Sequence, residues 1–350
     1  MEKEPAIIET AISEVSDVST LPVTIDIASN LPVIAQPDYP HFVEEWILFT
    51  KKHSGLKSAQ SERTYRNAIK QLVNYFDEQG TNIFTATDDD VYNWLETLKK
   101  EKSPSTVQLY LVAARLFFAF LHKQKIIAAN PCEGMKAGVS VNREHKRDYL
   151  SVARVQEMLA AMPATTEMEL RNRAVVALMV TSGLRCCEVQ KAQYGDIKTA
   201  GDSAVLYIQG KGRSAKDSYV KISPSTGKMI QEYLAVRFGG RRQPRENDYL
   251  FVSTSRNHTA DHDDELSTQT IRAIAKKAMK AIGFDDSRHT AHSFRHTAAT
   301  LGLRAGKELT EVQQMMRHAN VQTTLIYSHA LEREKNDTEN CIDALIFGKK

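Results

Sequence analysis

Residues 203–223 read SAVLYIQGKGRSAKDSYVKIS, and their pattern differs from that of the sequence on either side. Two runs rich in β-branched and aromatic residues flank the triplet Gly210-Lys211-Gly212, which is typical of a tight turn. The stretch therefore predicts a β-hairpin. On both sides of it, hydrophobic residues recur at the three- and four-residue spacing of helices. We expect a mainly α fold that carries one small antiparallel β-sheet.

The sequence before the hairpin predicts a separate helical domain over residues 38–135. Hydrophobic stripes at helical spacing lie within residues 41–53, 61–80, 88–98 and 103–125. The run Asp88-Asp89-Asp90 favours a helix N-terminus, because carboxylates stabilise that end of the helix dipole. Together the stripes predict a compact bundle of four helices.

Two polar segments border this bundle. Residues 1–37 form an acidic arm that we expect to be mostly disordered, and residues 136–148, KAGVSVNREHKRD, form a basic linker. The whole chain carries a net charge of +3 and the arm carries −5, so residues 38–350 carry +8. This excess favours a polyanionic partner.

A second domain is expected over residues 149–335. Ser151 is a good N-cap for a helix, and another helix near residues 169–182 ends at Gly183. Helical spacing resumes after the hairpin and continues to the end of the chain. Residues 336–350 are expected to form a tail helix with apolar side chains on one side.

The composition argues against several classes of protein. No apolar run reaches the ~20 residues that cross a bilayer. The first residues have no basic start and no continuous apolar stretch, so we expect no secretory signal and no membrane partner. The cysteines at positions 132, 186, 187 and 341 show no C-x-x-C spacing, which favours reduced thiols in a cytoplasmic protein.

The second domain holds several side chains that suit chemistry, and each has an ordinary alternative. Arg185 and Glu188 follow the helix stop and could form a simple ion pair. Lys211 could be an exposed turn lysine. His292 shares a helical face with His289 and His296, but no suitably spaced carboxylate or cysteine joins them, so we expect no metal site. Tyr327, judged alone, would more often be a core residue than a nucleophile.

Taken together, these residues suit one task, the cleavage of a phosphodiester. The planar guanidinium of arginine neutralises the non-bridging oxygens of a phosphate and of its transition state. Lysine can protonate a leaving oxygen, and histidine can donate a hydrogen bond or accept a proton. A tyrosine with a pKa near ~10 needs such a cationic setting to act as a nucleophile. This set calls for no metal and no other cofactor.

Four segments in this order resemble the signature motifs of the tyrosine recombinases, the family of the phage integrases and the Xer-type site-specific recombinases. They are TSGLRCCEV (181–189), IQGKG (208–212), HSFRH (292–296) and RHANVQTTLIYSH (317–329). The resemblance extends from about residue 38 to the C-terminus. It implies a helical core-binding, SAM-like domain followed by a mainly helical catalytic domain with a small antiparallel sheet.

The resemblance also implies roles for the residues. Arg185 and Arg295 would clamp the phosphate, and Glu188 would support Arg185. Lys211 would be the general acid, His292 a base or hydrogen-bond donor, His318 the second histidine position and Tyr327 the nucleophile. The partners would be double-stranded DNA with a specific site and three further copies of the chain, as a tetramer on two duplexes in the cytoplasm, on the nucleoid.

Basic residues outside this set are candidates for DNA contact, because phosphate neutralisation supplies much of the affinity for DNA. They lie near the second helix, in the linker and after residue 238: Lys57, Arg63, Arg66, Lys70, Arg143, Lys146, Arg147, Arg241 and Arg242. The ordinary alternative for each is a solvated surface side chain.

One motif departs from the family. The second histidine usually follows Leu-Gly, whereas here it follows Met316-Arg317, and the additional cation would either touch a phosphate or cap the turn. Two other functions stay open at this point. A type IB topoisomerase would use the same chemistry to rejoin the same strand, and a non-catalytic DNA-binding regulator would keep only the fold.

Overall fold

The computed structural model divides the chain into two compact units, Met1–Asn142 and Arg143–Lys350. It describes residues 39–53, 56, 58–140, 149–210, 215–240, 242–254 and 265–348, together with the short strands β1 (Thr24–Ile25) and β2 (Pro32–Val33), which pair antiparallel. In β1, β2 and residues 329–335 only the course of the backbone is described. The expected disorder of the arm and most of the linker lie outside the described residues.

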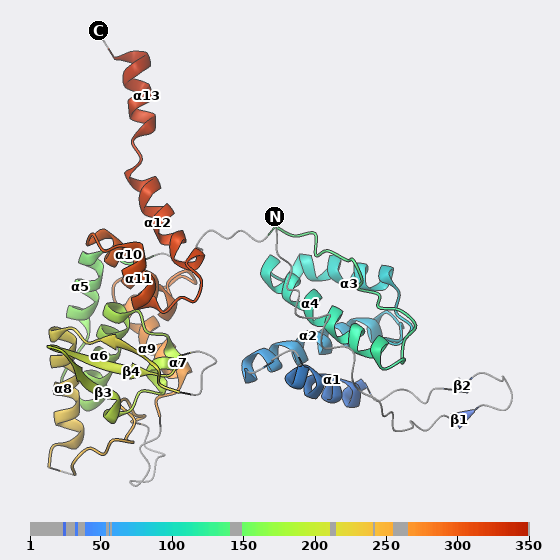
Figure 1. Cartoon of the computed structure of the whole chain (residues 1–350), viewed down its shortest axis with the longest axis horizontal. Helices are drawn as coiled ribbons and strands as arrows, with labels where there is room; N and C mark the ends of the chain where they lie inside the picture. Colours follow the sequence, from blue (N-terminus) through green and yellow to red (C-terminus); the bar gives the residue numbers. More distant parts are fainter. Residues whose placement is uncertain are drawn as a thin grey trace. The chain divides into compact units, whose positions relative to one another are not determined.

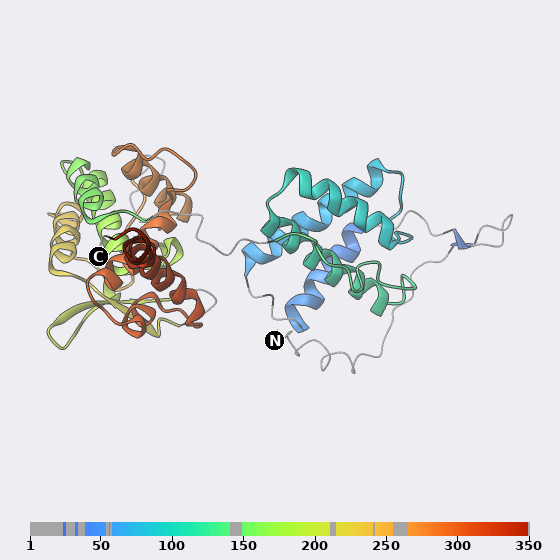
Figure 2. The same cartoon turned by 90° about the horizontal axis from the view of Figure 1, so that it is seen from above.

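The first unit is a bundle of four helices, as the hydrophobic stripes predict (Figure 2). They are α1 (Tyr39–His53), α2 (Ala59–Glu78), α3 (Asp88–Glu101) and α4 (Pro104–Lys123). Trp46 lies at the centre, where its ring stacks on Tyr65 and meets the edge of Phe117 at centroid distances of 5.8 and 5.3 Å. Thr87 caps α3 through a reciprocal hydrogen-bond pair with Asp90.

The helix α4 is the most apolar element of this unit. Among the described residues it is the one helix long and apolar enough to cross a membrane. Half of its apolar stretch is buried inside the unit, and Val107, Phe117, Phe118 and Leu121 are fully enclosed by the other helices. Its hydrophobicity is therefore that of a central core helix.

The second unit surrounds the helix α6 (Glu167–Ser182), which is buried along most of its length. The other elements are α5 (Val152–Ala161), α7 (Cys186–Gln190), the 3-10 turn η1 (Tyr194–Asp196), β3 (Ile197–Ala200), β4 (Ser203–Ile208), β5 (Ser218–Lys221), α8 (Pro224–Phe238), α9 (Thr268–Lys280), α10 (Ala291–Arg304), α11 (Leu309–Met316), α12 (Gln322–Lys335) and α13 (Thr338–Phe347). Helices α5, α8, α9 and α10 all pack against α6. The mainly α fold class is confirmed.

The predicted hairpin is present and belongs to a three-stranded antiparallel sheet in the order β3-β4-β5. Ile208 pairs with Ser218, so the connection between β4 and β5 spans residues 209–217. The strand β3, which pairs with β4 from Ile197 to Ala200, was not predicted. Its four residues are too few and too irregular in burial to show a period.

The tail forms the helix α13, which continues beyond α12 and leads away from the rest of the second unit (Figure 1). It exposes an apolar face made of Ile342, Leu345 and Ile346, of which Leu345 and Ile346 are 85% and 64% exposed. Exposed side chains of this size on one helix are unusual for a free surface.

Candidate active site

Arg295 is the centre of the site. It lies on α10, is 1% exposed, and donates hydrogen bonds to the carbonyl oxygens of Gly183 and Met316. These carbonyls belong to the C-terminal ends of α6 and α11, so one guanidinium joins three helices. Burial, together with the charges of Arg185 and Arg317, lowers the pKa of Arg295 to about 9. The guanidinium is still mainly charged at neutral pH.

Arg185 and Glu188 lie at the start of α7, directly after the turn at Gly183. The Arg185 backbone N–H donates to Glu188 Oε2 at 2.8 Å, and its Nη1 donates to Oε1 at 2.9 Å. The expected ion pair is therefore present, and Glu188 is 1% exposed. A buried carboxylate needs such partners, and these two bonds supply them from the arginine that precedes it.

Arg317 adds a second guanidinium to the same carboxylate. Its Nη2 donates to Glu188 Oε2 at 2.8 Å, and its Nη1 donates to the Met315 carbonyl at 2.6 Å. It also ends α11 in the left-handed backbone conformation, with φ 54°. Of the two roles considered from the sequence, capping of the turn is observed, and the bond to Glu188 is a further contact that the sequence did not suggest.

His318 follows in the turn between α11 and α12. Its Nδ1 lies 2.8 Å from Thr324 Oγ1, and the Gln313 amide donates to its carbonyl oxygen at 3.1 Å. Burial lowers the pKa of His318 to about 4, and the charges of Arg295, Arg185 and Arg317 act in the same direction. The imidazole is neutral at physiological pH, so one ring nitrogen carries a proton and the other accepts.

Tyr327 lies on α12 and is 5% exposed. Its ring lies nearly parallel to that of His318 at a centroid distance of 6.5 Å, and the ring of His296 meets it edge-on at 5.3 Å. Burial raises the pKa of Tyr327, whereas the charges of Arg295 and Arg185 lower it. The tyrosine is thus a core residue and a neighbour of the two arginines at once.

The histidines of α10 have separate environments. His292 is exposed in the first turn of the helix, with its ring centroid 5.1 Å from that of His296. His289 precedes the helix, where its Nδ1 lies 2.9 Å from Asp286 Oδ2 and its ring stacks on Phe284. Within the described ranges, no group of three histidine, cysteine or carboxylate side chains could hold a metal ion.

Lys211 lies outside the described residues, but the base of its loop is described. Lys216 Nζ lies 2.6 Å from Asp196 Oδ2 and 2.5 Å from Gln193 Oε1. These contacts tie the end of the loop to the 3-10 turn before β3.

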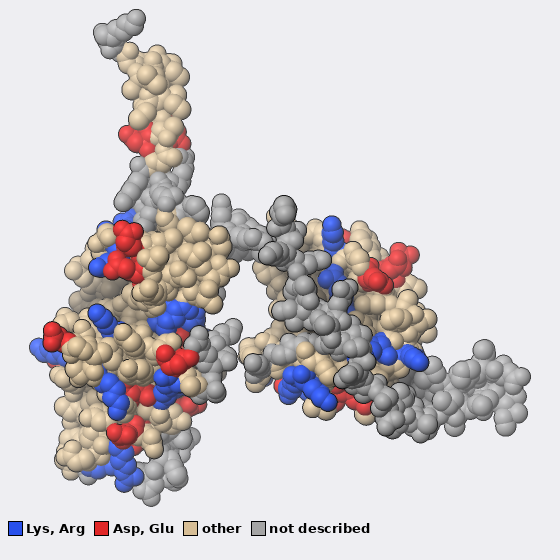
Figure 3. Space-filling model, in the orientation of Figure 1, with Lys and Arg blue, Asp and Glu red and all other residues tan. Residues whose placement is uncertain are grey.

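The candidates for DNA contact differ from one another. Arg66 is held by Glu44 and Glu62, and Arg242 by Asp248 at 2.6 Å, so both have intramolecular ion pairs. Arg63 and Lys70 are exposed on α2. The candidates that lie outside the described residues are Lys57, Arg143, Lys146, Arg147 and Arg241. On the face in Figure 3, basic side chains are mixed with acidic ones on each unit.

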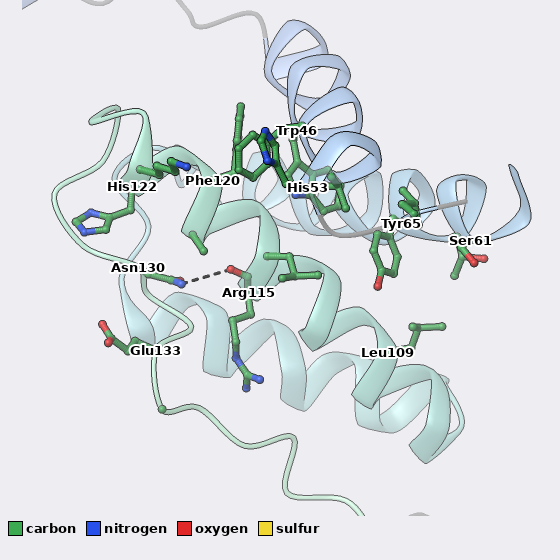
Figure 4. A pocket seen from close by; sticks show the side chains of 18 of the residues that line it. Trp46, His53, Ser61, Tyr65, Leu109, Arg115, Phe120, His122, Asn130 and Glu133 are labelled. Carbon is green, nitrogen blue, oxygen red and sulfur yellow. Dashed lines mark hydrogen bonds between the residues drawn. The ribbon is translucent and has the colours of Figure 1, made fainter. Parts of the chain in front are cut away.

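A groove of about 1290 Å³ lies in the first unit, between α1, α2 and α4 (Figure 4). Its walls are mostly apolar, with Trp46, Phe49 and Phe120 among them, and His122 and Lys123 lie at its edge. Asn130 closes one side by donating to the Arg115 carbonyl at 3.3 Å.

Comparison with known proteins agrees with this arrangement. The model of the family described as "Phage integrase family" matches residues 148–334, and that of the "Phage integrase, N-terminal SAM-like domain" matches residues 44–125. The chain belongs to the phage integrase family. The tyrosine recombinase family expected from the four motifs is confirmed.

Two bacterial recombinases are similar to the chain along most of their length. The tyrosine recombinase XerC of Herpetosiphon aurantiacus is 29% identical over 290 residues, which cover 82% of this chain and 90% of the relative. The tyrosine recombinase XerD of Listeria innocua is 26% identical, with 84% and 96% covered. Both alignments therefore extend well beyond the four motifs.

Solved structures share the fold. The XerH recombinase bound to a palindromic difH substrate superposes with a TM-score of 0.66 at 19% identity, covering 85% of this chain and 84% of that one. A lambda integrase dimer bound to a COC' core site gives 0.61 at 16% identity, covering 81% and 96%. At these identities the likeness concerns the fold.

Three residues of the site were missed by sequence reasoning. They are Arg317 as a partner of Glu188, Thr324 as the partner of His318, and His296 as the ring against Tyr327. Thr324 lies six residues after His318 and three before Tyr327, so a helical register for α12 could have placed it on the inner face. The other two contacts depend on how separate helices pack.

Proposed function

We propose that this protein is a site-specific DNA recombinase that cuts and rejoins strands through a covalent 3′-phosphotyrosyl link on Tyr327. The observation that carries the proposal is the convergence of Arg185, Arg295, His318 and Tyr327 from four separate elements. The acid bonded to Arg185, Glu188, is itself shared with Arg317. Such a site suits a phosphodiester and its negatively charged transition state.

The chemistry is an exchange of one phosphoester for another. Tyr327 Oη attacks the scissile phosphorus, its proton passes to His292, and the bond from phosphorus to the 5′ oxygen breaks. Lys211 protonates that oxygen, which leaves as a 5′-hydroxyl. A 5′-hydroxyl from the partner duplex then reverses the step. Because the energy of the broken ester is kept in the new one, the cycle needs no nucleotide hydrolysis.

His318 fits this scheme as a neutral donor. We assign its Nδ1 as the acceptor of a hydrogen bond from the Thr324 hydroxyl, which places the ring proton on Nε2. A neutral imidazole in that tautomer can donate to a non-bridging phosphate oxygen. Arg185 and Arg295 supply the positive charge, and His318 supplies a directional hydrogen bond that orients the phosphate.

The assembly follows from the same family. We propose four protomers on two duplexes, with both units of each protomer bound to the DNA. The exposed apolar face of α13 would dock on a neighbouring protomer. A lambda integrase tetramer bound to a Holliday junction shares the fold at a TM-score of 0.63. The recombinase would act in the cytoplasm, on the nucleoid.

The experiment is a trap of the covalent step. Duplexes are enriched by the full chain from a random-sequence library and then nicked beside the cleavage point, so that the released fragment diffuses away. Wild type is expected to give a denaturant-resistant protein–DNA band with the DNA attached at Tyr327. Tyr327→Phe should bind the same duplex without forming the band. A band that persists in this variant would show that another residue is the nucleophile.

The same substrates distinguish a recombinase from the two alternative functions, a type IB topoisomerase and a non-catalytic regulator. A recombinase exchanges strands between two duplexes, whereas a topoisomerase relaxes supercoils and returns each strand to its own duplex. The family match favours the recombinase. A regulator that kept only the fold would bind the selected duplex and form no covalent band.

A further inference from the structure

Arg317 occupies its position at a cost. Its backbone is left-handed, with φ 54°, a conformation that is sterically unfavourable for a residue other than glycine. Its side chain is only 12% exposed, so its charge is largely withdrawn from water. Glycine at this position would avoid both costs, and the contacts of the guanidinium must offset them.

The contacts of Arg317 reach two different parts of the site. The bond to the Met315 carbonyl is local and closes the end of α11. The bond to Glu188 spans 129 residues of sequence and joins the turn that carries His318 to the start of α7. In the described part of the chain the Nε of Arg317 is buried without an acceptor, so the side chain is not optimised for stability alone.

The Glu188 carboxylate is held from two sides. Oε1 accepts from Arg185, and Oε2 accepts from Arg317 and from the Arg185 backbone N–H. With one guanidinium, the carboxylate and Arg185 would form a neutral pair. With two guanidiniums, the cluster of Glu188, Arg185 and Arg317 keeps a net positive charge, which can interact with a phosphate.

We propose that Arg317 is a positioning residue for Arg185: it fixes Glu188, and through it the arginine of α7, relative to the turn that carries His318. This inference rests on the proposed recombinase function and deepens it. Arg317 replaces the glycine that is usual at this position by a side chain that locks two catalytic segments together. It acts on the phosphate through Arg185 and makes no contact with DNA of its own.

The test compares Arg317→Gly and Arg317→Lys with wild type on the nicked substrate in single turnover. Arg317→Gly is expected to cleave about 10-fold more slowly at saturating DNA, because a misplaced catalytic group loses one to two orders of magnitude in rate. Its thermal stability should be equal to that of wild type or higher, since backbone strain and a buried charge are removed. Arg317→Lys keeps the charge without the paired donors and should lose less.

Three outcomes would overturn the positioning role. Cleavage by Arg317→Gly at the wild-type rate would show that the contact between Arg317 and Glu188 does not affect the reaction. A loss of DNA affinity with a shallower salt dependence would show direct phosphate contact instead. A lower melting temperature with normal cleavage would leave Arg317 as a helix cap only. A wild-type protein that forms no covalent band would refute the recombinase function itself, which is a separate result.

Two controls separate the positioning role of Arg317 from its effect on stability. Lys125 is also left-handed, with φ 59°, and lies in the first unit. Lys125 is exposed, so Lys125→Gly should reproduce the gain from relief of backbone strain alone while cleaving at the wild-type rate. In a double-mutant cycle, Arg317→Gly should cost much less in a Glu188→Gln background, because both changes remove the same link. Independent, multiplicative effects would contradict action through Glu188.

Discussion

Acidification should destabilise this protein through His318. A free histidine has a pKa of about 6.5, whereas burial and the neighbouring arginines lower the pKa of His318 to about 4. Between these pH values His318 is protonated in the unfolded chain and neutral in the folded chain. The unfolded state is therefore favoured as the pH falls from about 6.5 towards 4, and the stability lost here is fully present above 6.5.

The size of this effect follows from the two pKa values. Between pH 7.5 and pH 5 the linkage amounts to about 2 kcal/mol, and screening of the partly exposed ring reduces it to about 1–2 kcal/mol. The assay is urea unfolding of wild type and His318→Gln at both pH values. Glutamine does not titrate but can still bond to Thr324, so the variant keeps the contact and loses the pH dependence.

The comparison isolates the histidine because all other titrating groups are common to both proteins. The free energy of unfolding of wild type should fall by about 1–2 kcal/mol more than that of His318→Gln. Equal losses in the two proteins would refute the reasoning. So would a proton NMR titration in which the His318 ring protonates near its ordinary pKa in the folded state.

Two further substitutions test the packing around the site. Thr324→Val removes the hydroxyl that orients His318, so we expect cleavage to slow by about 10-fold while DNA binding is kept. Thr324→Ser keeps a hydroxyl and should cleave at the wild-type rate. A normal rate for the valine variant would contradict the assigned tautomer of His318. Gly183→Ala forces a Cβ to within 2.7 Å of Met316 Sδ at φ 63°, so urea unfolding should show a loss of about 2–4 kcal/mol. Gly201→Ala, also left-handed at φ 57° but with open space, should lose only about 1–2 kcal/mol.

Local sequence pattern was sufficient for most elements, because helices and hairpins are encoded by residues that are close in the chain. The hydrophobic stripes of the first unit meet in one core around Trp46 and Trp94. The hairpin was recognised because its two strands each have a local signal, whereas the tight turn expected at Gly210-Lys211-Gly212 is instead a connection that spans residues 209–217. The strand β3 was missed because four residues with mixed burial carry no period, and its pairing with β4 alone makes it a strand.

Long-range partners could not be predicted in the same way. Arg66 stays a candidate for DNA contact, and nothing in the sequence indicated that Glu44, 22 residues earlier and on another helix, binds its guanidinium. Glu188 was expected to support Arg185, and nothing in the sequence placed Arg317 on its other oxygen. Charged side chains are long, and which acid meets which base depends on helix packing that the pattern of one helix does not contain.

The environment of Tyr327 sets a condition on the chemistry. Burial raises the pKa of its phenol, and the opposing charges of Arg185 and Arg295 leave it raised. The free protein therefore holds the tyrosine protonated within a small apolar cluster with Val312 and Met316. A bound phosphate adds negative charge, which disfavours a phenolate still further. In the proposed reaction the proton would therefore leave Tyr327 as the bond to phosphorus forms, so attack by Tyr327 would depend on a base being in place at that moment.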